Sequence, residues 1–253
     1  MGNYLFILEG TKDEPKLFNS LFREMKKDDR QRCYFFRCNL HALANLLMPN
    51  ADDDLDGIDL LMALKGRDNS KEEAEVLNHR YTDIFLVFDF EPQEDRPAFE
   101  KIRKMVAYFD DSTNNGKLYI NYPMMQSYRH FTALPDPGFE YREAVANPAK
   151  SYKQLVEEEG KAIPSGLQSY NHIQLYAIAV HHLKKREKVL GRPYELPDQY
   201  DEHEDKNLFD IQNQKRMRDG SCFVLNTSIL LLVAYAPKRF INEVKRHPDS
   251  YPI

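Results

Sequence analysis

Four short apolar runs in the first half of the chain predict buried strands. They cover residues 3–8, 33–38, 83–90 and 117–122. The first and third runs are almost continuously apolar, and they end near Gly10 and Pro92. Runs of this length and composition are typical of strands that are covered on both faces. We therefore predict a sheet with little exposure to solvent.

Segments between these strands have the spacing of amphipathic helices. The clearest lies at 13–27, where apolar residues repeat at helical intervals from Leu17 to Met25. Further helices are predicted at residues 41–48, 58–65, 71–78 and 97–109. Alternating strands and helices imply βαβ units. The expected fold class is α/β, with a Rossmann-like, mostly parallel sheet flanked by helices.

The pattern changes in the second half, where helical spacing dominates. Helices are predicted at residues 151–159, 167–188, 208–218 and 227–244. The stretch 191–205 is rich in prolines and acids and is predicted to be a loop. We therefore divide the chain into an α/β domain at 1–148 and a mainly helical region at 149–253.

The charge is distributed unevenly along the chain. The net charge is −5, and residues 1–149 contain 19 Lys and Arg against 26 Asp and Glu. The rest has 16 basic and 14 acidic residues. A uniformly basic nucleic-acid binder would have a different composition. Acids gathered around a metal, with basic groups in a second region, would produce this distribution.

The cysteine content and the apolar runs indicate in which cellular compartment the protein is expected. The three cysteines are odd in number and form no CxxC pair, which argues against a disulfide framework and a structural zinc site. Reduced thiols fit a cytoplasmic protein. The start, MGNYLFILEG, lacks the basic stretch of a secretion signal, and the apolar run at 228–237 is too short to span a bilayer. We expect no membrane partner.

Two predicted strands end in acidic residues. Glu9 follows the first strand, and Asp89 and Glu91 stand at the end of the third. Parallel strands present their carboxyl ends at one edge of a sheet, and alternation along an extended strand would place Asp89 and Glu91 on the same side. Carboxylate oxygens are preferred ligands of Mg²⁺. The sequence therefore predicts a site for Mg²⁺ (or Mn²⁺) formed by these three residues.

This arrangement resembles the Toprim superfamily. Its signature is a Glu-Gly-x-x-Asp motif after a first strand, here EGTKD at 9–13, and an Asp-x-Asp type ending after a later strand, here DFE at 89–91. The strand at 117–122 and the following PMMQSY resemble a further block of small stand-alone bacterial Toprim-like proteins. Similar families include the overcoming-lysogenization-defect nucleases, the RloB-like proteins and nuclease subunits of phage-defence systems. The resemblance covers about the first half of the chain.

The resemblance implies roles for individual residues. Glu9 matches the glutamate that acts as metal ligand or as general acid or base, and Asp89 matches the first aspartate of the metal-binding pair. Glu91 replaces the second aspartate, and Asp13 matches the acid that closes the first motif. Gln126 stands where close relatives are expected to carry an acid, so the choice between a one-metal and a two-metal mechanism stays open.

Several of these residues have structural alternatives. Thr11 and Glu14 fit a capping box, and Asp13 fits an N-cap. Lys12 would contact a phosphate or cover the surface of a helix. His130, close to the expected site, would take part in proton transfer or form an ordinary polar contact.

Two basic clusters are candidates for contacts with the nucleic-acid backbone. Their members are Lys184, Lys185, Arg186 and Lys188 in one cluster, and Lys215, Arg216 and Arg218 in the other. The alternative for both is a solvated helix end, where cations suit the helix dipole.

The leading functional hypothesis is a metal-dependent endonuclease that hydrolyses phosphodiester bonds of DNA or RNA. The resemblance further implies an effector in defence against phage that is controlled by a separate ATPase subunit. The chain contains no G-x-x-x-x-G-K-[ST] motif, so ATP hydrolysis by the chain itself is not expected. The alternatives are a decayed Toprim module that binds nucleic acid or protein, and a phosphohydrolase for small substrates. The sequence leaves the oligomeric state open.

Overall fold

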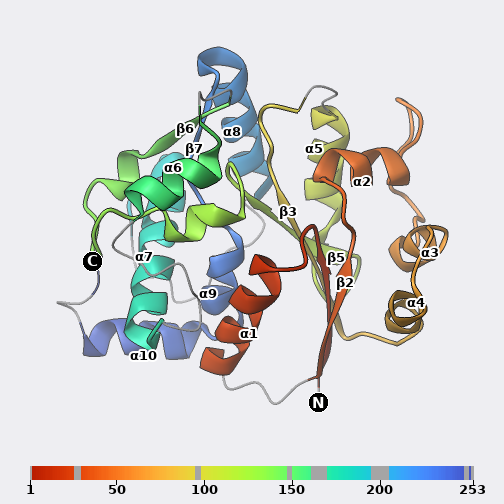
Figure 1. The fold of residues 1–253 in the computed structure, drawn as a ribbon, viewed down its shortest axis with the longest axis horizontal. Helices are drawn as coiled ribbons and strands as arrows, with labels where there is room; N and C mark the ends of the chain where they lie inside the picture. The colour runs from red at the N-terminus through yellow and green to blue at the C-terminus, as the bar shows by residue number, and fades with distance from the viewer. Residues whose placement is uncertain are drawn as a thin grey trace.

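A computed structural model describes residues 2–25, 30–94, 98–146, 150–160, 170–194, 205–247 and 251. Their central feature is a five-stranded sheet with strand order β2-β1-β3-β5-β4 (Figure 1). The strands are β1 (Asn3–Leu8), β2 (Arg30–Phe35), β3 (Asp83–Asp89), β4 (Asp110–Asp111) and β5 (Gly116–Asn121). β2, β1, β3 and β5 are parallel, and β4 pairs antiparallel with β5. The predicted α/β class with a mostly parallel sheet is confirmed.

The two central strands β1 and β3 form where apolar runs can be covered on both faces. Every residue of β1 after Asn3 is buried, and Phe6 stacks against Phe18 of helix α1 (Asp13–Met25) at 4.6 Å between ring centroids. Phe6 also stacks on Phe85 of the neighbouring strand at 4.9 Å. The strand predicted at 33–38 lies three residues earlier, because β2 pairs with β1 from Arg30 to Phe35.

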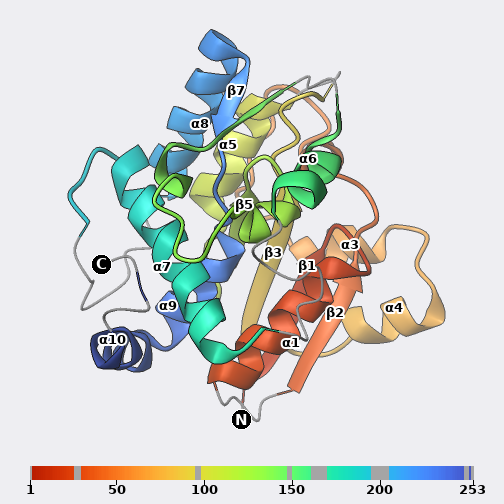
Figure 2. The ribbon, with the colours of Figure 1, turned by 60° about the vertical axis from the view of Figure 1, so that its left-hand side comes forward.

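Helices cover both sides of the sheet. Between the strands lie α2 (Leu40–Leu47), α3 (Leu60–Lys65), α4 (Lys71–Leu77) and α5 (Phe99–Tyr108). Figures 1 and 2 show α1 on one side of the sheet, and Figure 1 shows α2 and α5 on the other. All four helices lie within two residues of the predicted boundaries, as expected when apolar periodicity decides the buried face.

The second half is mainly helical, as predicted. It contains α6 (Tyr152–Glu159), α7 (His172–Val189), α8 (Asp205–Asp219), η4 (Ser228–Leu230), α9 (Leu231–Tyr235) and α10 (Pro237–Arg246). The predicted helix at 227–244 is broken at Ala236, because Pro237 cannot continue the preceding hydrogen-bond ladder and instead begins α10. Most of the loop predicted at 191–205 lies outside the described residues.

Several short elements were not predicted from the sequence. A two-stranded antiparallel sheet joins β6 (Glu143–Val145) to β7 (Ser221–Phe223), and two 3₁₀ helices, η1 (Met125–Arg129) and η2 (Phe139–Tyr141), follow β5. β6 and β7 come from opposite sides of the division proposed at residue 148, and buried side chains of both parts belong to one hydrophobic core.

In the described parts of the chain, no helix is long and apolar enough to cross a membrane.

Candidate metal centre

The first and third strands bring two acidic residues together at the carboxyl edge of the sheet. Leu8 of β1 pairs with Val87 of β3. Glu9 comes one residue after Leu8 and Asp89 two residues after Val87, so both lie at the ends of adjacent strands. The Oε2 atom of Glu9 accepts a hydrogen bond of 3.1 Å from the backbone amide of Asp89. The carboxyl group of Asp89 accepts another from the amide of Met125, the first residue of η1. Residues that are 80 positions apart thus share one site.

Glu14 is a further acid of this site, for which the sequence pattern predicted only a capping role. It lies in the first turn of α1 and is only 8% exposed. Its Oε2 and Oε1 atoms lie 2.8 and 2.9 Å from the position that a Cβ on Gly10 would occupy. The glycine of the Glu-Gly pair therefore leaves room for the Glu14 carboxylate. The sequence pattern that could have indicated this role is a glutamate five residues after Glu9, at the start of an amphipathic helix.

Glu91 reaches the site by a different route from the one predicted. β3 ends at Asp89, and Glu91 has a left-handed backbone with φ of 43°, so the expected strand alternation does not extend to it. Its Oε2 atom accepts a hydrogen bond of 2.9 Å from Nδ2 of Asn39, which also donates to Oε2 of Glu94 at 2.7 Å. The Oδ1 atom of Asn39 caps α2 through the amide of Ala42. Asn39 was not a sequence candidate.

We call Glu9, Glu14, Asp89 and Glu91 the acidic cluster, and burial and like charge raise the pKa of two of its members, Glu9 and Asp89. Burial, with smaller contributions from Glu91 and Glu14, raises the pKa of Glu9 to about 8, against the lowering effect of the Asp89 amide. Burial and then Glu9 and Glu14 raise the pKa of Asp89 well above its usual range. A bound cation would relieve both penalties.

The chemistry of the cluster fits a hard divalent cation, since its side-chain donors are all carboxylate oxygens. In the described residues, no three or more His, Cys, Asp or Glu side chains form a group with the geometry to hold a metal ion. Carboxylates without a cation repel one another, so binding of an ion would have to draw them together.

Two of the accessory candidates, Lys12 and Gln126, lie at different depths. Lys12 is exposed just before α1, whereas Gln126 is buried in η1, next to the residue that binds Asp89. Asp13 begins α1, and its side chain lies outside the described part of the structure. The structure therefore brings Gln126 towards the cluster through η1 and leaves Lys12 at the surface.

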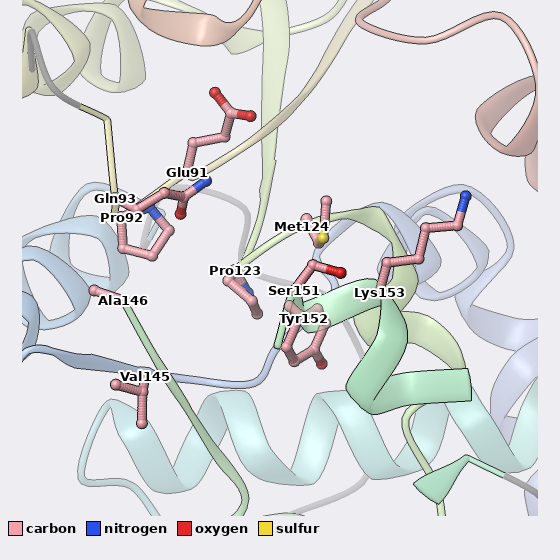
Figure 3. A pocket seen from close by; sticks show the side chains of 10 residues that line it. All are labelled: Glu91, Pro92, Gln93, Pro123, Met124, Val145, Ala146, Ser151, Tyr152 and Lys153. Carbon is pink, nitrogen blue, oxygen red and sulfur yellow. The ribbon is translucent and has the colours of Figure 1, made fainter. Parts of the chain in front are cut away.

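A pocket opens beside the acidic cluster. It has a volume of about 320 Å³ and is bordered by the segments that follow β3 and β5, by the end of β6 and by the first turn of α6 (Figure 3). Glu91 belongs both to the cluster and to the pocket lining. The amide of Glu91 donates to the carbonyl of Pro123 at 3.2 Å, which joins the two strand extensions at this point.

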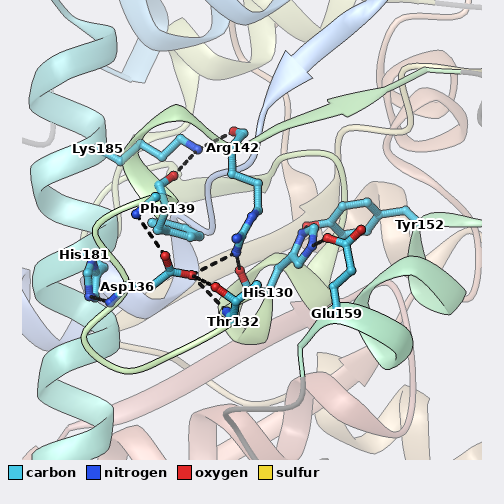
Figure 4. Close-up of polar contacts among 10 residues, drawn as sticks. His130, Thr132, Asp136, Phe139, Arg142, Tyr152, Glu159, His181 and Lys185 are labelled. Carbon is cyan, nitrogen blue, oxygen red and sulfur yellow. Dashed lines mark hydrogen bonds and ion pairs between the residues drawn. The ribbon is translucent and has the colours of Figure 1, made fainter.

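Three of the predicted nucleic-acid contacts are buried, which corrects both interpretations of the basic clusters. Lys185, Arg186 and Lys215 are 0, 1 and 6% exposed. The amine of Lys185 donates to the carbonyl oxygens of Phe139 and Arg142 (Figure 4). These two carbonyl groups lie 46 and 43 residues away from Lys185 in the sequence, so the pattern of α7 gave no sign of them. A phosphate cannot reach side chains that are enclosed in this way.

The other two buried cations are paired with acids. The Nη1 atom of Arg186 lies 2.7 Å from Glu187, and the amine of Lys215 lies 2.8 Å from Glu143 and 3.0 Å from Asp219. The remaining candidates are less enclosed. Lys188 and Arg218 are exposed, whereas Lys184 and Arg216 are partly exposed. Contact of these four residues with nucleic acid stays a prediction.

His130 forms a polar contact inside the protein. Its Nδ1 atom lies 2.9 Å from the hydroxyl of Tyr152, and its Nε2 atom lies 3.1 Å from Oε2 of Glu159 (Figure 4). The imidazole is 1% exposed, and burial lowers its pKa. These contacts attach α6 to the segment that follows η1.

Comparisons with models of protein families, with curated proteins and with solved structures found no match to this chain. The relation to the Toprim superfamily therefore stays a resemblance carried by the motifs at 9–13 and 89–91.

Proposed function

We propose that this protein is a Toprim-like nuclease that uses Mg²⁺ or Mn²⁺ to hydrolyse phosphodiester bonds of DNA or RNA. The observation that supports the proposal most is the meeting of Glu9 and Asp89 at the carboxyl edge of a parallel sheet, with the Glu9 carboxylate 3.1 Å from the Asp89 amide. In sheets of this kind, ligands bind beyond the carboxyl ends of the strands.

In this proposal, Glu9 and Asp89 are the principal ligands, and Glu91 and Glu14 complete the acidic surroundings. When bound, the cation would neutralise charge on the scissile phosphate and favour ionisation of a water molecule. The protein contributes orientation: the Met125 amide holds the Asp89 carboxyl group, and Asn39 holds the Glu91 carboxylate. Groups that orient metal ligands in this way commonly affect metal affinity by about 10- to 100-fold.

The biological setting follows from the resemblance alone. It implies an effector in defence against phage and control by a separate ATPase subunit. Both are part of the proposal, and the nuclease chemistry does not depend on them.

A cleavage assay tests the proposal directly. The protein is incubated with plasmid, single-stranded DNA and total tRNA, each with Mg²⁺, Mn²⁺ or EDTA. We expect cleavage of at least one substrate with a divalent cation and none in EDTA. Because Glu9→Gln and Asp89→Asn each remove a ligand charge, we expect both to lower the rate by at least about 100-fold.

The matched control is Glu75→Gln, which changes an exposed glutamate on α4 far from the cluster in sequence and should leave the rate unchanged. Binding of nucleic acid without cleavage in every metal would favour a binding module. Release of phosphate from nucleotides alone would favour a phosphohydrolase. Cleavage that persists in Glu9→Gln and Asp89→Asn would contradict the assignment of the site.

A further inference from the structure

The pocket beside the acidic cluster has a mainly apolar lining. Pro92, Pro123, Met124, Val145 and Ala146 contribute to it, together with the ring of Tyr152. These residues come from the extensions of β3 and β5, from β6 and the residue after it, and from α6. Ligand pockets of about 300–1,000 Å³ commonly combine such an apolar lining with a few polar groups. The volume of about 320 Å³ lies at the small end of this range.

The aromatic ring of the pocket is held in a fixed position. Tyr152 is 8% exposed, and its hydroxyl contacts Nδ1 of His130 at 2.9 Å. Nε2 of His130 in turn contacts Glu159, near the end of the same helix, at 3.1 Å. The ring is therefore held at both ends, by the backbone of α6 and by His130. A ring that is held in this way forms a fixed wall of the pocket and loses little side-chain freedom when a ligand binds against it.

The charged residues of the pocket lie at its edge. Figure 3 shows the side chains of Glu91 and Lys153 extending away from the apolar groups, with both charged ends towards the top of the view. Glu91 belongs to the acidic cluster, and Lys153 is an exposed cation in the first turn of α6. A ligand with a flat apolar part and an attached anion would match this arrangement.

We propose that this pocket binds a nucleobase of the substrate strand, with the adjoining phosphate near Lys153 and on the side of the acidic cluster. This inference rests on the proposed nuclease function and adds to it a base-binding subsite made of Tyr152, Met124 and Val145. The apolar walls and the ring take the base by stacking, which tolerates different base identities. The lysine balances the acids of the cluster for an anionic strand.

The test measures binding separately from cleavage. The full chain is titrated in EDTA with adenosine and uridine 5′-monophosphate, and with ribose 5-phosphate as a probe that lacks the base. Isothermal calorimetry gives each dissociation constant. Because the base supplies the stacking contact, we expect the two nucleotides to bind about 5- to 150-fold more tightly than ribose 5-phosphate.

Three substitutions localise the binding. Val145→Asp places a carboxylate at the pocket edge, where the native side chain is 61% exposed, so the fold should tolerate it and nucleotide affinity should fall at least about 5-fold. The matched control is Met217→Asp on α8, where the native side chain is 64% exposed and does not line the pocket. Tyr152→Phe keeps the ring but removes the hydroxyl that contacts His130, so nucleotide affinity should fall less than in Val145→Asp.

The two proposals fail in different ways. Equal binding of ribose 5-phosphate and the nucleotides, no measurable nucleotide binding, or unchanged affinity in Val145→Asp would each overturn the subsite. These results would leave metal-dependent cleavage, and its loss in Glu9→Gln, unaffected. Nucleotide binding that is lost in Val145→Asp supports the subsite even if no metal gives cleavage, in which case only the nuclease proposal fails.

Discussion

Replacing Glu9 by glutamine should stabilise the metal-free protein and remove its response to Mg²⁺. The substitution deletes one charge from the acidic cluster and keeps an oxygen that can accept the Asp89 amide, so the fold should be retained. In the folded protein, burial and the neighbouring acids raise the pKa of Glu9 from 4.5 to about 8. A neutral glutamine resembles the protonated form that this environment favours.

The sign of the pH dependence follows from proton linkage. Between pH 4.5 and about 8 the folded protein keeps a proton on Glu9 that the unfolded chain releases. The stabilisation from this group is therefore complete below pH 4.5 and is lost as the pH rises through 8. At 1.36 kcal/mol per unit, the limit above pH 8 is about 5 kcal/mol. Because Asp89 titrates with Glu9, we expect Glu9→Gln to gain about 1–3 kcal/mol at pH 8.

Urea unfolding followed by circular dichroism measures this effect. Wild type, Glu9→Gln and the control Glu75→Gln are compared in EDTA at pH 4 and pH 8. We expect the gain in Glu9→Gln to appear at pH 8 and to vanish at pH 4. In a second series at pH 8, Mg²⁺ at 100 times its dissociation constant should stabilise wild type by about 2.7 kcal/mol and Glu9→Gln far less.

Two outcomes would refute this reasoning. If Glu9→Gln and wild type lose stability in parallel from pH 4 to pH 8, Glu9 does not carry the buried charge. If Mg²⁺ stabilises both proteins equally, the ion binds elsewhere.

Three further predictions concern the surroundings of the site and the fold. Asn39→Ser keeps an N-cap for α2 and removes the amide donor to Glu91. We expect Mg²⁺ affinity, measured by calorimetry, to fall about 10-fold with little change in melting temperature, and an unchanged affinity would exclude this positioning role. Gly160→Ala should lower the free energy of unfolding by about 1–3 kcal/mol in thermal denaturation, because its Cβ would lie 2.5 Å from a backbone oxygen, whereas the less crowded Gly66→Ala should be tolerated. Lys185→Met should lower the free energy of unfolding by about 1–3 kcal/mol, because it leaves two carbonyl groups without their donor. The salt dependence of nucleic-acid binding, measured by fluorescence anisotropy, should stay unchanged, and a smaller salt dependence would show a direct phosphate contact.

Strands and long helices could be predicted because local pattern and tertiary burial agree. The run at 3–8 is apolar after Asn3, so only a strand that is covered on both faces can bury it, and β1 has the predicted boundaries. The pairing of β6 with β7 could not be predicted in this way. Each strand has three residues, and β7 is held beside α8 by two hydrogen bonds between Gln212 and the backbone of Phe223, a contact that no local pattern indicates.

The residues of the candidate site likewise fall into those that the sequence predicted and those that depend on tertiary packing. Glu9 and Asp89 were accessible to sequence reasoning because parallel strands end at a common edge, whatever packs around them. Glu14 was predicted only in a capping role and Asn39 was not predicted, since the distances of their side chains from Glu9 and Asp89 depend on how α1 and α2 approach the sheet. The inward direction of Lys185 likewise depends on carbonyl groups of the segment around η2.

The sequence by itself determined the α/β class, the two acid-tipped strands and the helical second half, because these depend on periodicity and composition within short windows. Only the tertiary structure decided which acids join the cluster, which cations are enclosed and where the pocket opens. These properties arise from side chains far apart in the sequence, and their distances are set by the packing of helices on the sheet, to which no local pattern corresponds.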